Sequence, residues 1–105
     1  YRDFYAKLAA LPAERLRQSI APMGRITFGR DDFLSRLPEL NAATTLVMGG
    51  DQDKPRPPAE AREMAELIGC PYVEVPEAGH ISNLENPAFV TETLLMFLSE
   101  RNRLV

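Results

Sequence analysis

The sequence is poor in the residues that build disulfides, metal sites and nucleic-acid surfaces. It has one cysteine, Cys70, and one histidine, His80, so it can form no internal disulfide and no zinc site of the usual kinds. Its formal net charge of -3 argues against a nucleic-acid partner, because a phosphate-binding surface needs a basic excess. No apolar run approaches the ~20 residues of a membrane span, and no signal peptide is visible. We therefore expect a cytoplasmic chain without a metal, nucleic-acid or membrane partner.

What is present is an ordinary globular composition. The 105 residues are 45% hydrophobic and 26% charged, which is typical of a soluble domain. A chain of this length supports one small domain that buries about 60–70% of its unfolded surface. It begins with Tyr1 rather than Met, so we expect either that an upstream part has been removed or that Tyr1 is a chosen boundary.

The first part of the chain predicts helices. Apolar residues from Phe4 to Ile20 recur at helical spacing. We predict a helix over residues 3–20, divided at Pro12, which opens the second piece as a first-turn proline. Residues 21–24 (APMG) are predicted to end this helix, and residues 31–37 to form a short helix with acidic residues at its positive end.

The second part predicts alternating strands and helices. Residues 44–48 (TTLVM) form a short apolar run that favours a strand buried on both faces of a parallel sheet. Residues 58–68 predict an amphipathic helix, residues 72–75 a second strand and residues 78–85 a loop. The pair Asn86-Pro87 then starts a last helix, with a predicted buried face of Val90, Leu94, Phe97 and Leu98. A strand–helix–strand order implies parallel pairing, and hence the α/β class.

Two ionisable residues follow the two predicted strands. Asp53 comes after the first strand and His80 after the second. The carboxyl ends of parallel strands share one edge of a sheet, where ligands bind. A carboxylate there that accepts the Nδ1–H of an imidazole fixes its tautomer and stabilises the imidazolium formed during catalysis. The alternatives are a surface histidine and turn-forming aspartates; Asp51 is predicted to bond nearby backbone amides.

These two turns resemble those of a known superfamily. Residues 50–57 (GDQDKPRP) match the pattern G-x-x-D-x-x-x-P, and residues 75–80 (VPEAGH) end a strand in Gly-His. In this order they resemble the acid turn and the histidine turn of the α/β-hydrolases, most of all esterases and 3-oxoadipate enol-lactonases. The resemblance is clear from about residue 33 to residue 98. It implies a segment like the end of the family's lid region over residues 1–40 and the C-terminal part of the hydrolase core over residues 41–105.

The resemblance also implies roles. Asp53 matches the triad acid and His80 the general base of a cofactor-free enzyme. Ile81 and Leu84 lie beside the base and are candidates to line an acyl pocket, with plain packing as the alternative. Lys54 and Arg56 flank the acid and are either contacts for a substrate carboxylate or solvated turn charges.

The third member of the triad is missing. The family's nucleophile sits in a G-x-S-x-G elbow ahead of the acid, and none of the chain's serines lies in one. We therefore expect an enzyme fragment that is inactive alone, from a parent acting on a small ester or lactone. A cofactor-free haloperoxidase-like member and a non-catalytic binding module are the alternatives. An uncovered apolar strand edge predicts pairing with the missing N-terminal half, or self-association.

Overall fold

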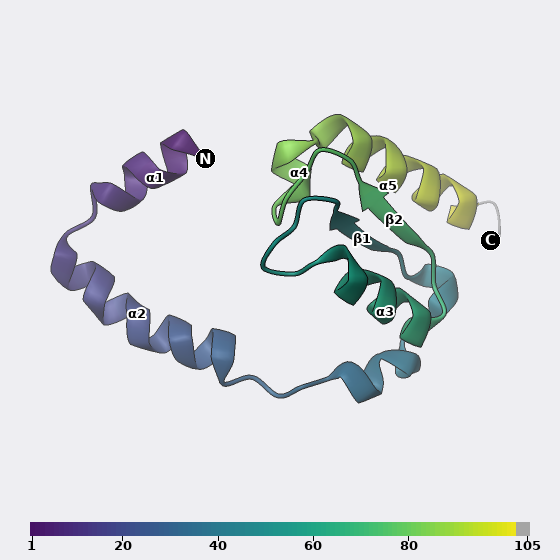
Figure 1. The fold of residues 1–105 in the computed structure, drawn as a ribbon, viewed down its shortest axis with the longest axis horizontal. Helices are drawn as coiled ribbons and strands as arrows, with labels where there is room; N and C mark the ends of the chain where they lie inside the picture. Colours follow the sequence, from purple (N-terminus) through teal and green to yellow (C-terminus); the bar gives the residue numbers. More distant parts are fainter. Residues whose placement is uncertain (103–105) are drawn as a thin grey trace. The chain divides into compact units, whose positions relative to one another are not determined.

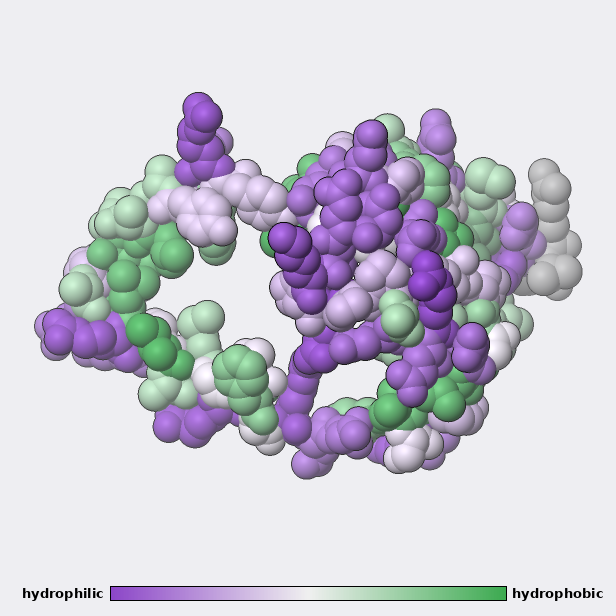
Figure 2. Space-filling model, in the orientation of Figure 1, coloured by the Kyte–Doolittle hydropathy of each residue, from purple (hydrophilic) through white to green (hydrophobic). Residues whose placement is uncertain are grey.

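The computed structural model describes residues 1–102, which divide into two compact units, Tyr1–Asp32 and a second that begins at Phe33 (Figure 1). The first unit consists of α1 (Arg2–Ala9) and α2 (Ala13–Phe28), and neither helix contains a buried residue. Apolar side chains are exposed along this unit, where green atoms are frequent in Figure 2. The break at Pro12 is confirmed, although Pro12 is the N-cap residue before α2 and not a residue of its first turn.

The prediction that residues 21–24 end this helix is wrong. Helix α2 runs through Pro22 and Gly24 to Phe28, and the Gly29 N–H donates to the Arg25 carbonyl at its end. A proline inside a helix removes one hydrogen-bond donor and bends the helix, but the turns on either side can continue.

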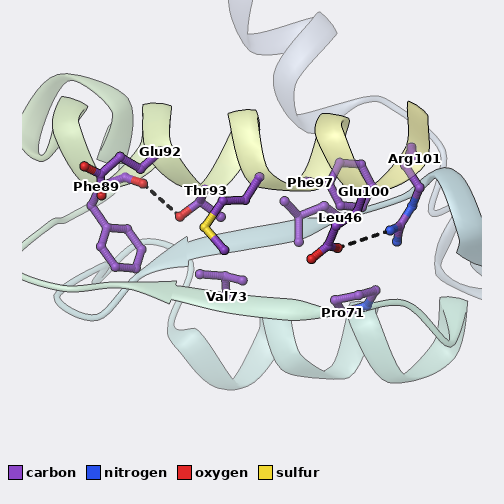
Figure 3. A pocket seen from close by; sticks show the side chains of 10 residues that line it. Leu46, Pro71, Val73, Phe89, Glu92, Thr93, Phe97, Glu100 and Arg101 are labelled. Atoms are coloured by element: carbon purple, nitrogen blue, oxygen red, sulfur yellow. Dashed lines mark hydrogen bonds and ion pairs between the residues drawn. The ribbon is translucent and has the colours of Figure 1, made fainter. Parts of the chain in front are cut away.

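The second unit is a three-layer α/β arrangement. Its sheet has two parallel strands, β1 (Val47–Gly50) and β2 (Tyr72–Val75), with Val47 opposite Tyr72 and Gly50 opposite Val75. Helix α3 (Pro58–Ile68) covers one face and α5 (Pro87–Asn102) the other (Figures 1 and 3). The parallel α/β prediction is confirmed for this small sheet, and α3 and β2 have the predicted bounds.

The first strand begins later than predicted. Residues 44–48 were expected to form it, but Ala42–Thr44 form a short 3-10 helix, η2, and β1 starts at Val47. The Asn41 side chain accepts from the Ala43 N–H at 3.0 Å, and the Thr45 hydroxyl donates to the Asn41 carbonyl at 2.7 Å. These local bonds compete with strand pairing. The short helix before them is also 3-10, η1 (Leu34–Glu39).

The core on the α5 side is small. Val75, Ala78 and Val90 are buried, and Met48 and Phe89 pack against them. The predicted buried face of α5 is only partly right, because Leu94 and Leu98 are 41% and 55% exposed. The side chains of α5 that face the sheet are instead Phe89, Thr93 and Phe97, which are half-buried (Figure 3). A sheet of two strands is too narrow to cover more of the helix.

Candidate acid–base site

The acid turn follows β1 directly. Asp53 lies three residues beyond the end of β1, and its N–H donates to the Gly50 carbonyl at 3.2 Å. The Arg56 N–H donates back to Asp53 Oδ1 at 2.9 Å. These bonds close the turn around the carboxylate, whose side chain is only 8% exposed. The polar, proline-rich segment that follows leads into α3.

The histidine turn follows β2 and is tied to the acid turn. The Asp51 N–H donates to the Val75 carbonyl at 3.0 Å, and the Gln52 N–H donates to the Ala78 carbonyl at 2.9 Å. Gly50 lets the two turns meet, since a Cβ there would lie 2.3 Å from the carbonyl oxygens of both Ala78 and Gly79. Both turns are thus held at the same edge of the sheet.

The predicted contact between acid and base is present. His80 Nδ1 lies 3.0 Å from Asp53 Oδ2 and 3.3 Å from Asp53 Oδ1. An ionised carboxylate can only accept hydrogen bonds, so Nδ1 carries the proton and a neutral His80 has Nε2 free as a base. The His80 side chain is 57% exposed, so a further group can reach it.

The surroundings of Asp53 favour its charged form. Burial opposes ionisation, but the Arg56 amide, the hydrogen bond from His80 and the charges of His80 and Arg56 together hold the pKa of Asp53 below its usual value. The carboxylate is therefore ionised under neutral conditions, as an orienting acid must be.

The other predicted site residues lie outside this contact. Ile81 and Leu84 are 40% and 67% exposed, and neither lines the cavity between α5 and the sheet. Their role at an acyl pocket stays a prediction. Arg56 forms an exposed ion pair with Glu60 at 3.3 Å, as expected of a solvated turn charge. The short helix α4 (Ser82–Glu85) occupies part of the predicted loop.

Two further carboxylates, those of Asp51 and Glu85, bind backbone amides of the histidine turn in ways that the sequence did not predict. Asp51 was expected to bond nearby amides, but its Oδ1 accepts from the Ala78 N–H at 3.1 Å, across 27 residues. Glu85 Oε2 accepts from the Gly79 N–H at 2.9 Å. The Asp51 bond has no local signature, since it depends on how the two turns fold against each other. The Glu85 bond spans only six residues, all of them in the segment that follows β2.

A cavity of about 390 Å³ lies elsewhere in the second unit, between α5 and the sheet (Figure 3). Leu46 and Pro71, which precede the two strands, line one end, and Phe89 and Phe97 of α5 line its roof. Neither Asp53 nor His80 borders it. Within residues 1–102, no group of three histidine, cysteine or acidic side chains is placed to hold a metal ion. In that same range no helix has the length and apolar character of a membrane span.

Comparison with known proteins finds two similar sequences. Both are named "Putative non-heme bromoperoxidase BpoC" and come from two strains of Mycobacterium tuberculosis, CDC 1551 / Oshkosh and ATCC 25618 / H37Rv. Each is 35% identical over 68 residues, 62% of this chain and 26% of the relative. The chain therefore spans about a quarter of these relatives' length. No family model and no solved structure matches the chain. The similarity agrees with a relation to the α/β-hydrolases.

Proposed function

We propose that this chain is the C-terminal part of a cofactor-free α/β-hydrolase-type enzyme, in which Asp53 is the acid and His80 the base of a triad. The contact of 3.0 Å between His80 Nδ1 and Asp53 Oδ2, at the carboxyl edge of a parallel sheet, carries the proposal. The nucleophile comes from outside these 105 residues, which contain no G-x-S-x-G elbow.

The geometry supports a general acid–base role for His80. Asp53 holds the imidazole through Nδ1, so Nε2 takes the proton of an upstream hydroxyl as it attacks an ester or lactone carbonyl. His80 then returns this proton to the leaving group, while Asp53 stabilises the imidazolium formed between the two steps. Loss of the orienting carboxylate costs on the order of 10⁴ in kcat where such triads are known.

The similarity to two proteins named as non-heme bromoperoxidases favours a second candidate function. A cofactor-free haloperoxidase-like enzyme would use the same acid and base. A non-catalytic binding module is the third candidate. A G-x-S-x-G elbow in the full-length sequence supports either enzyme, and its absence supports the binding module.

The role of the pair is tested by the tautomer of His80. Because His80 is the single histidine, its ring nitrogens can be read in proton–nitrogen spectra of the labelled chain without assignment. At about pH 9, where a histidine is neutral, we expect the Nδ1–H tautomer to dominate in the native chain. Asp53→Asn should shift the population to Nε2–H, because a carboxamide can donate to Nδ1.

Asp31→Asn, in an exposed position of the first unit, is the matched control and should leave the tautomer unchanged. A dominant Nε2–H tautomer in the native chain would contradict the proposed roles of Asp53 and His80.

A further inference from the structure

Among the four residues before His80, one has a backbone conformation that L-amino acids rarely adopt. Glu77 has a φ of 55°, the one non-glycine residue with positive φ in the part of the chain described. Such a conformation persists where the surrounding structure holds it in place, and it is common where a functional side chain must be aimed. The question is therefore what holds residues 76–79.

Three side chains hold this turn, each by one hydrogen bond to its backbone. Asn86 Nδ2 donates to the Pro76 carbonyl at 2.8 Å. Asp51 Oδ1 accepts from the Ala78 N–H at 3.1 Å, and Glu85 Oε2 accepts from the Gly79 N–H at 2.9 Å. Two carboxylates thus bind the amides of two successive residues directly ahead of the base.

The two carboxylates come from opposite directions along the chain. Asp51 belongs to the acid turn, two residues before Asp53, whereas Glu85 ends α4, five residues after His80. Gly79 suits the second contact, since a Cβ there would lie 3.1 Å from Glu85 Oε2, and the carboxylate would have to shift slightly to make room for it. Hydrogen bonds to a charged acceptor are roughly twice as strong as neutral ones.

We propose that Asp51 and Glu85 are positioning residues for His80: by binding the Ala78 and Gly79 amides they aim the imidazole at Asp53. This inference rests on the proposed function, because it concerns the same acid–base pair. It assigns the two side chains a role in orienting the base, separate from any contact with substrate.

Paired substitutions at Glu85 separate the hydrogen bond from the charge. Glu85→Gln keeps an oxygen acceptor for the Gly79 amide, whereas Glu85→Ala removes it. In Glu85→Ala we expect the His80 Nδ1–H population to fall toward the level of Asp53→Asn, and the Gly79 amide to exchange about tenfold faster. Glu85→Gln should retain the native tautomer. Glu63→Ala, at an exposed position of α3, is the control.

Several outcomes would overturn the inference. One is that Glu85→Ala keeps the native Nδ1–H tautomer of His80. Another is that Glu85→Gln loses this tautomer, which would assign the effect to the charge of Glu85 alone. If Glu85→Ala does not fold, the through-bond coupling between the Gly79 nitrogen and the Glu85 carboxyl carbon in the native chain decides, and its absence refutes the inference. An Nε2–H tautomer in the native chain would instead refute the proposed function, so the two failures are distinct.

Discussion

Asp53 is an almost buried carboxylate that remains charged because its hydrogen bonds offset the cost of burial. The Arg56 N–H and His80 Nδ1 both bind its oxygens, at 2.9 Å and 3.0 Å. Neither partner is available in the unfolded chain, where an aspartate titrates at about 3.9. The lowered pKa of Asp53 is therefore linked to folding.

This linkage predicts an acid-labile contribution to stability. Because the folded pKa of Asp53 lies below the unfolded value, its contribution is fully present above about pH 4 and is lost as pH falls through the folded pKa. We expect Asp53→Asn to lower the free energy of unfolding by on the order of 1 kcal/mol at neutral pH, and by less in acid. Urea titrations of both chains across this range measure the difference. If the difference in the free energy of unfolding between the native chain and Asp53→Asn widens toward low pH, this account is contradicted.

At the scale of elements, the end of β1 is pressed against the histidine turn. A Cβ on Gly50 would lie 2.3 Å from two carbonyl oxygens, and these belong to backbone that cannot rotate away. The glycine pair at residues 49–50 forms the end of β1, whereas the predicted strand stopped at residue 48.

Gly50→Ala should separate the two turns. We expect a loss of roughly 1–3 kcal/mol in the free energy of unfolding, together with loss of the Nδ1–H tautomer of His80, because the Gln52–Ala78 backbone bond cannot form at its present length. Gly24→Ala in α2 is the control, since a Cβ there meets nothing within 4 Å. Thermal unfolding and the histidine spectra measure both effects. A Gly50→Ala chain with native values of both would refute the close approach.

At the scale of the whole molecule, much apolar surface lies outside the core. Strand β1 has β2 as its one neighbour in the described sheet, and Leu95 and Leu98 of α5 are 60% and 55% exposed. A two-stranded sheet is marginal by itself, and an open strand edge with apolar flanks invites pairing. The lid-like role of residues 1–40 stays a prediction; the structure groups η1 with the second unit.

If the proposed function holds, we expect the chain to self-associate or to bind the part of the enzyme that supplies the nucleophile. Light scattering of the native chain should show species larger than a monomer at micromolar concentration. Leu95→Glu should shift the distribution toward monomer, because it places a charge on the exposed side of α5, whereas the conservative Leu95→Met should not. A monodisperse monomer in the native chain would count against this expectation.

Local sequence patterns accounted for a definite part of the structure. The bounds of α3 and β2 were predicted residue for residue, since spacing, a first-turn proline and a C-terminal glycine act within a few residues of one another. The order of strands and turns likewise placed Asp53 and His80 at one sheet edge. Errors arose where local signals compete, as in the 3-10 turn capped by Asn41 before β1.

The folded chain decided what local pattern could not. Asp51 binds an amide 27 residues away, and Leu94 and Leu98 are exposed although their spacing suits a core. A hydrogen bond between distant segments, or the width of the sheet beneath a helix, depends on which surfaces meet after folding. Residue type and spacing specify which groups are available, whereas packing in three dimensions determines their partners.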